Sequence, residues 1–84
     1  MEKSQTEAVR EFFDGLAADP RFRSLRNKHY LGQIAAFHRS VIPPHSRVLE
    51  LGCETGQLLA AINPQVGVGI DLSPNMIDLA RRSY

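Results

Sequence analysis

The sequence predicts an α/β fold in which two parallel strands form a small sheet and helices pack beside it. Two short apolar runs have the pattern of strands: residues 48–51, which stop at Gly52, and Val66–Ile70, in which apolar residues alternate with Gly67 and Gly69. Before and between these runs, apolar residues recur at intervals of three and four, which is typical of helices. The order strand, helix, strand favours parallel pairing, and the two glycines predict close packing against a neighbouring layer.

The first helix is predicted to begin after Ser4, because Ser4 and Glu7 have the spacing of a capping box. Asp19 and Pro20 end it, since proline disfavours helical geometry in the residue before it. One apolar stripe follows this helix and is interpreted as part of the core: Val9, Phe12, Phe13, Leu16 and Ala17.

A second helical stretch covers residues 22–42. We expect it to bend near Asn27 or Gly32 and to end at Pro43 and Pro44. Its stripe, also interpreted as core, consists of Phe22, Leu25, Leu31, Ile34, Ala35, Phe37, His38, Val41 and Ile42.

Two shorter helices are predicted in the second half of the chain. Thr55 is expected to cap the first, which ends at Asn63 after about two turns. Ser73 is expected to cap the last helix, with Pro74 at its first position. Asp71 follows the second strand directly and therefore stands at the edge of the sheet where ligands of parallel sheets bind.

The turn after the first strand carries the most chemical information. It reads E-L-G-C-E-T-G from Glu50 to Gly56, with Glu54 where a third glycine would complete a two-residue rhythm. In such a turn, free backbone N–H groups and the positive end of the next helix converge, which predicts a site for a polar cofactor. A plain strand-to-helix turn is the alternative interpretation.

Two other nucleotide-binding motifs do not fit this turn. A dinucleotide-binding G-x-G-x-x-G motif beginning at Gly52 requires glycine where Glu54 and Gln57 stand. A phosphate-binding P-loop requires lysine directly after its last glycine, and Gln57 occupies that position.

The stretch R-V-L-E-L-G-C-E-T-G, from Arg47 to Gly56, resembles the first motif of the class I S-adenosylmethionine-dependent methyltransferases, which usually reads V-L-E-L-G-C-G-T-G. The stretch G-V-G-I-D-L-S-P-N-M, from Gly67 to Met76, resembles the second strand and acidic ribose-binding position of the same family. Together they reach from Arg47 to about Arg82, nearly half the chain. The resemblance implies a Rossmann-like sheet, of which this chain would supply the first two strands.

The resemblance also implies a set of residues that bind S-adenosyl-L-methionine: Glu50, Gly52, Cys53, Gly56, Asp71, Leu72, Met76 and Tyr30. In the family, the acid after the second strand binds the ribose diol, and Asp71 would have this role. The alternative is that Asp71 is an acid that the helix dipole favours at the start of the next helix. Glu50 would order the turn and the cofactor's amino end, with hydrogen-bond donors near it because a buried charge is costly. Leu72 and Met76 would line the adenine or belong to the core. Tyr30 would touch the methionine end or be a half-buried packing residue.

The family's sheet has about seven strands and needs roughly twice the length of this chain. We therefore expect the 84 residues to be the N-terminal part of a longer enzyme, with more chain after Tyr84. Residues 1–45 would form a helical segment on the cofactor side, and residues 46–84 the first βαβ unit and the start of the next helix. No residue in this part has the character of a general base, so catalytic residues are not assigned.

Composition excludes several classes of function. The net charge is +1, so neither nucleic acid nor an anionic membrane is an expected partner, and the short basic cluster at residues 21–28 is interpreted as a solvated helix face. The single Cys53 and three histidines have no metal-ligand spacing. Without a membrane span or a signal peptide, the expected location is the cytoplasm.

The sequence leaves two main hypotheses. The first is methyl transfer from S-adenosyl-L-methionine to an unknown acceptor. The second is a non-catalytic, methyltransferase-like partner module that has lost cofactor binding, which Glu54 favours. A dinucleotide oxidoreductase, the third, is disfavoured by Glu54 and Gln57.

Overall fold

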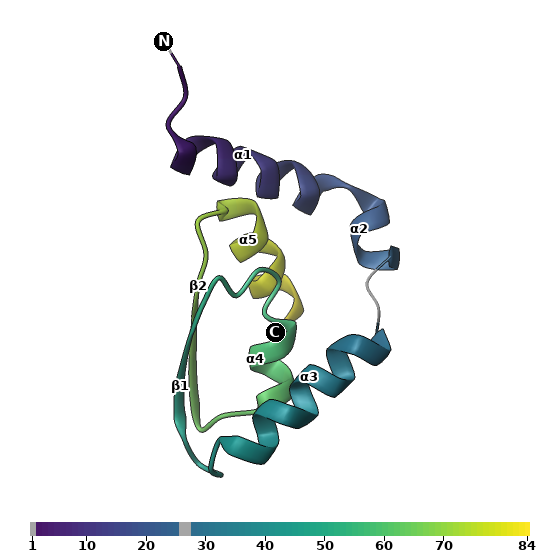
Figure 1. Cartoon of the computed structure of the whole chain (residues 1–84), viewed down its shortest axis with the longest axis vertical. Helices are drawn as coiled ribbons and strands as arrows, with labels where there is room; N and C mark the ends of the chain where they lie inside the picture. The colour runs from purple at the N-terminus through teal and green to yellow at the C-terminus, as the bar shows by residue number, and fades with distance from the viewer. Residues whose placement is uncertain (1, 26–27) are drawn as a thin grey trace.

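The computed structural model describes residues 2–25 and 28–84, with side chains for 2–22 and 29–84. Its elements in chain order are α1 (Gln5–Ala18), α2 (Pro20–Leu25), α3 (Lys28–Val41), β1 (Arg47–Leu51), α4 (Gln57–Ile62), β2 (Val66–Ile70) and α5 (Pro74–Ser83). The described chain is thus a small α/β structure with a two-stranded sheet, as predicted (Figure 1).

Strands β1 and β2 are parallel and paired in register along their whole length. The glycines of β2 face the helices at very short range. A Cβ atom at Gly67 would lie 2.9 Å from Pro64 Cγ, and one at Gly69 would lie 2.7 Å from Cys53 Sγ. The prediction of close packing is confirmed, because side chains at these two positions would collide with the layer above them.

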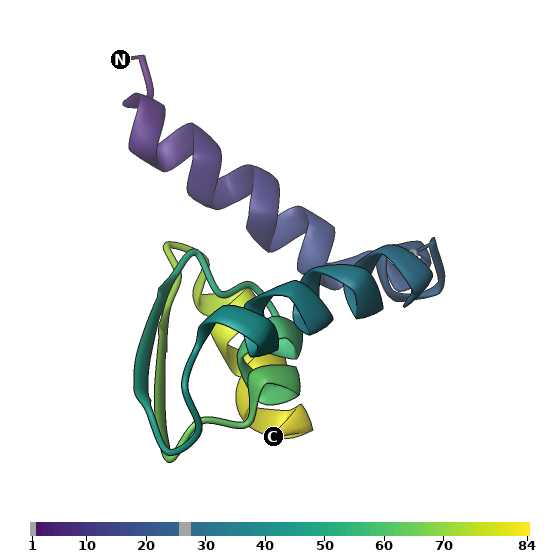
Figure 2. The same cartoon turned by 60° about the horizontal axis from the view of Figure 1, so that its bottom comes forward.

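The helices lie on one side of the sheet. Figures 1 and 2 show α3, α4 and α5 beside the same face, with α3 packed along α4. An N–H of the Arg39 side chain on α3 donates to the Ala61 carbonyl in the last turn of α4, at 2.9 Å. This bond satisfies a carbonyl at the helix end and fixes α3 to the βαβ unit.

Helix α1 crosses the beginning of α5 near the ends of the strands (Figure 1). Its predicted limits are confirmed: the Glu7 amide donates to Ser4 Oγ at 3.1 Å, and the helix ends at Asp19. Its stripe is not core, which corrects the prediction. Phe12 is 65% exposed and Val9 is exposed as well, whereas Phe13, Leu16 and Ala17 are half-buried, because α1 packs mainly against α5 in the described part of the chain.

The second helical stretch is two helices rather than one. Helix α2 ends at Leu25 and α3 begins at Lys28, while the bend expected near Asn27 lies outside the described residues. Helix α3 continues through Gly32 and ends at Val41, before the two prolines as predicted. Asp19 helps to start α2, because its carboxylate accepts the Arg21 amide at 2.9 Å.

The cap of α4 differs from the prediction. Gly56, with φ of 78°, is the N-cap residue and has no side chain to cap the helix, whereas Thr55 precedes the cap and is buried beside the turn. The left-handed conformation at the cap explains the difference, because glycine adopts it without strain. Ser73 does cap α5 as predicted, accepting the Met76 amide at 3.1 Å.

Within residues 2–25 and 28–84, no helix combines the length and the apolar character needed to cross a bilayer.

Candidate functional site

A pocket of about 400 Å³ lies where both strands end. This is the edge of the sheet at which the sequence analysis placed Asp71 and expected a ligand. We call it the strand-end pocket. Its lining comes from α1, the two strand ends and the turn: Val9, Phe13, Leu51, Gly52, Glu54, Ile70, Asp71 and Leu72. The wall is mainly apolar, with two carboxylates and no cationic side chain among these lining residues.

The turn between β1 and α4 holds three residues in the left-handed region. Gly52 and Gly56 have φ of 76° and 78°, which glycine adopts freely. Glu54 has φ of 49°, and a residue with a Cβ pays about 1–2 kcal/mol for that conformation. The turn therefore keeps its shape despite the missing glycine, at a local cost in strain.

The amides of this turn are bound inside the protein. The Gly52 and Cys53 amides both donate to the Ile70 carbonyl, at 2.7 and 3.0 Å. The Glu54 amide donates to the Asp71 carboxylate at 2.8 Å, and the Gly56 amide donates to the Cys53 carbonyl at 2.8 Å. The expectation of free amides is wrong for these four groups, because three of them donate to acceptors at or just after the end of β2 and the fourth donates to a carbonyl within the turn.

Asp71 ties the turn to the start of α5. Its Oδ2 accepts the Glu54 amide, and its Oδ1 accepts the Ser73 amide at 2.9 Å. A carboxylate oxygen has two acceptor positions, so each oxygen keeps one for a second donor. Asp71 thus stands in the pocket as predicted, but with a structural role that the sequence did not reveal.

Asp14 was missed by the sequence analysis. Its Oδ1 accepts from the Ser73 hydroxyl and from the Asn75 amide, the latter at 3.2 Å. A carboxylate is favourable there, because the first turn of α5 presents unpaired amides and the positive end of the helix. The polar contact fixes α1 above the strand-end pocket. Its only sequence signal was an acid beside the apolar stripe of α1.

Glu50 does not have the donors that were expected. Its Oε1 is buried without a hydrogen-bond partner in the described part of the chain, and it points to the helix side of the sheet. Burial raises the pKa of Glu50; His38 lowers it, and the charge of Glu54 raises it further. The ring of His38 is already held, with Nδ1 2.7 Å from the Ile34 carbonyl oxygen. Glu50 does not line the strand-end pocket.

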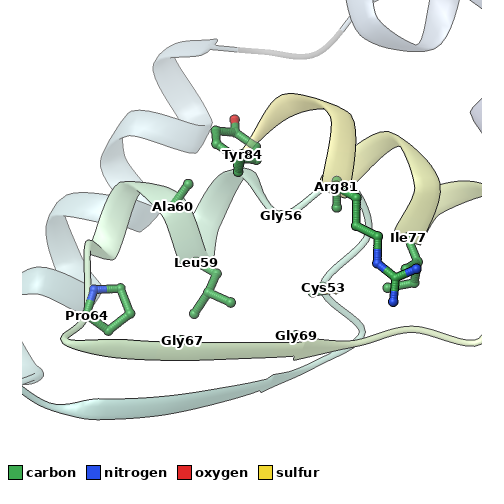
Figure 3. A pocket seen from close by; sticks show the side chains of 11 residues that line it. Cys53, Gly56, Leu59, Ala60, Pro64, Gly67, Gly69, Ile77, Arg81 and Tyr84 are labelled. Carbon is green, nitrogen blue, oxygen red and sulfur yellow. The ribbon is translucent and has the colours of Figure 1, made fainter.

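A second pocket, of about 360 Å³, lies between β2 and helices α4 and α5 (Figure 3). We call it the helix-side pocket. Gly67 and Gly69 form its floor, and Cys53 and Gly56 line it rather than the strand-end pocket. Burial raises the pKa of the Cys53 thiol, and the Asp71 charge adds to this effect.

Three further predicted residues lie in different surroundings. Leu72 lines the strand-end pocket and is exposed. Met76 is fully buried, so it belongs to the core and does not line an open adenine site. Tyr30 is 59% exposed on α3 and does not line the strand-end pocket, so it is not the half-buried packing residue of the alternative interpretation. Of the predicted set, the structure gathers Gly52, Asp71 and Leu72 in this pocket.

No family model matches the chain, and no curated protein or solved structure proves similar to it. The described residues also contain no group of three metal-ligating side chains. The function must therefore be argued from the two motifs and from the strand-end pocket.

Proposed function

We propose that this chain is the cofactor-binding part of an S-adenosylmethionine-dependent methyltransferase and that the cofactor occupies the strand-end pocket. The observation that carries the proposal is the composition of the lining: two carboxylates, Glu54 and Asp71, stand among apolar side chains. S-adenosyl-L-methionine has a positive sulfonium and amino group, a ribose diol and an apolar adenine face, and each matches part of this lining.

The same charges argue against a dinucleotide. A pyrophosphate needs free amides or cations at the turn. Here the Gly52, Cys53, Glu54 and Gly56 amides are bound to protein acceptors, and the Glu54 carboxylate would repel phosphate. Helix α4, with six residues, adds little dipole. The pocket therefore supports a cationic adenosyl ligand over an anionic one.

The residues would divide the work as follows. Asp71 would accept the ribose hydroxyls with the acceptor positions that its backbone bonds leave open. Leu72, Val9 and Phe13 would cover the apolar faces and exclude water. S-adenosyl-L-methionine supplies an activated methyl group, so the protein has chiefly to align it with an acceptor atom about 3–3.5 Å away. The acceptor and any catalytic base are not assigned to this chain.

A second candidate is the non-catalytic partner module. It is favoured by Glu54, which is strained and occupies part of the wall, and by Asp71, both of whose oxygens already accept backbone amides. In such a module, Asp71 would serve the fold alone.

Isothermal titration calorimetry with S-adenosylhomocysteine and S-adenosylmethionine tests the proposal, with NADH as the control ligand. We expect both adenosyl ligands to bind, the sulfonium form at least as well because of the acidic lining, and NADH to give no heat. Absence of adenosyl binding by a folded chain would favour the partner module. Binding of NADH without binding of either adenosyl ligand would support the dinucleotide hypothesis instead.

A further inference from the structure

One face of the sheet has no helix packed along it in the described chain, and α1 approaches it only at the strand ends, where Leu51 and Ile70 line the strand-end pocket. Figures 1 and 2 show the helices on the opposite side. We call this surface the open face. Five exposed apolar residues of β1 and β2 form it: Leu49, Leu51, Val66, Val68 and Ile70. The intervening residues, such as Val48 and Gly69, point to the helices, so the alternation separates a covered face from an apolar open one.

A parallel sheet in this condition is unusual. Parallel strands normally lie buried between two layers, and a contiguous apolar patch on a soluble protein marks an interaction surface. Leu49 is 59% exposed and its neighbour across the strands, Val68, is 51% exposed. These two residues stand at the middle of the open face, where burial by a partner would be most complete.

The surface area gives the scale of the missing contact. The chain exposes 6392 Å². A folded monomer of its mass exposes about 5,000 Å², which leaves an excess of about 1,400 Å². A standard interface buries about 800 Å² on each partner. The radius of gyration, 14.1 Å, likewise exceeds the value of about 12 Å for a compact chain of this length. The excess belongs to the whole chain, including exposed apolar residues of α1 and α3, and one standard interface on the open face would account for a little over half of it.

We propose that two copies of this chain associate through their open faces, sheet against sheet. A two-fold axis through the middle of the face packs the open face of one copy against the same face of the other. Such a contact needs no complementary charges, and the open face offers none at its centre. The one charged residue on this side of the strands, Arg47, lies at the beginning of β1. An antiparallel arrangement of the two copies keeps both Arg47 side chains apart at opposite ends. Sheets packed in this way stand about 10 Å apart with interdigitated side chains.

Leu51 and Ile70 of the open face also line the strand-end pocket, so the test uses Leu49, which does not line it. Analytical ultracentrifugation from low to high micromolar concentration tests the proposal on three proteins: the wild type, Leu49→Lys and the control Val41→Lys. Val41 lies on α3 and is 59% exposed, the same fraction as Leu49. We expect dimers for the wild type and Val41→Lys. Leu49→Lys should weaken the dimer by roughly 30-fold or more, as loss of a central interface residue does.

Circular dichroism of each protein shows whether it is folded. If Leu49→Lys does not fold, Leu49→Thr replaces it, because threonine is compatible with a strand and still removes most of the apolar contact. The melting temperature of the wild type should also rise with protein concentration, as it does when a dimer dissociates on unfolding. A folded wild type that stays monomeric overturns the proposal. So does a dimer that Leu49→Lys leaves intact, since the strands would then pair at their edges, and so does equal weakening by Val41→Lys.

Discussion

The two walls of the strand-end pocket are held in different ways. The wall formed by the turn is fixed by short-range bonds: four amides between Gly52 and Gly56 find acceptors within the turn, at Ile70 or at Asp71. The wall formed by α1 is fixed at one polar point, the Asp14 carboxylate above Ser73, while Phe12 and Val9 remain exposed.

This difference separates a preformed wall from a movable one. The turn keeps its conformation without a ligand, because its backbone bonds do not depend on one. Helix α1 buries little apolar area, and elements with few buried contacts open at low free-energy cost. If a cofactor binds in the pocket, α1 is therefore the wall that should tighten around it, and the turn should stay as it is.

Replacement of Asp71 should have the largest effect. Asp71→Ala removes two charge-assisted hydrogen bonds, each contributing about 1.5–3 kcal/mol. We expect the melting temperature to fall by well over 10 °C, since about 1 kcal/mol corresponds to 4–8 °C in a domain of this size. Adenosyl ligand binding should be lost as well. Asp71→Asn, which keeps one acceptor, should recover part of the stability. An unchanged melting temperature would show that the turn holds its shape without Asp71.

The second-largest effect on stability is expected from the close packing behind the turn. Gly69→Ala would place a Cβ 2.7 Å from Cys53 Sγ and 2.8 Å from Cys53 Cβ. Forced overpacking of this kind typically costs about 1–3 kcal/mol. Gly32→Ala is the matched control, because a Cβ there meets nothing within 4 Å and an alanine inside α3 should stabilise the helix. The midpoint of urea unfolding should therefore fall for Gly69→Ala and rise for Gly32→Ala. A neutral Gly69→Ala would mean that the turn gives way easily.

Asp14 tests the other wall. Asp14→Ala should cost about 1–2 kcal/mol, the contribution of a hydrogen-bonded charge at a helix start. Hydrogen exchange should rise in α1 and remain unchanged in the turn. Asp78→Ala serves as the control, because Asp78 pairs with Arg82 in an exposed salt bridge, which contributes about 0–1 kcal/mol. Faster exchange in both walls would contradict the separation between them.

The sequence predicted the preformed wall far better than the movable one. Strand limits, the Ser73 cap and the place of Asp71 follow from local patterns, because each depends on residues a few positions apart. The contact between Asp14 and Ser73 joins residues 59 positions apart, and no local pattern signals it. Helical periodicity indicated that α1 has an apolar stripe, but it does not tell whether anything covers Phe12. The environment of Glu50 was equally inaccessible, because it depends on how α3 meets the sheet.

Glu50 should make stability depend on pH. Its folded-state pKa is raised, chiefly by burial, with opposing effects from His38 and Glu54. Below the ordinary pKa of glutamate, both the folded and unfolded states are protonated and no penalty arises. Between the ordinary and the raised pKa, the unfolded chain releases its proton first, so the free energy of unfolding falls as the pH rises. Above both values the full penalty remains.

Glu50→Gln removes this titration. We expect the variant to be more stable than the wild type at neutral pH and to lose that advantage in acid. Thermal unfolding across this pH range measures the difference. A constant difference between wild type and Glu50→Gln at all pH values would mean that the pKa of Glu50 is the same in the folded and unfolded states.

Glu54 should give the smallest change in stability and the sharpest test of the pocket. Glu54→Gly relieves a left-handed strain of about 1–2 kcal/mol, but glycine costs about 0.5–1 kcal/mol in backbone entropy. The net gain should be at most about 1.5 kcal/mol. Loss of one carboxylate from the wall should weaken binding of S-adenosylmethionine relative to S-adenosylhomocysteine, because only the former has a sulfonium charge. Titration of both ligands measures this ratio. A gain of about tenfold or more for both ligands alike, equal to about 1.4 kcal/mol, would mean that the Glu54 side chain obstructs the pocket. The partner module would then explain the molecule better than the enzyme.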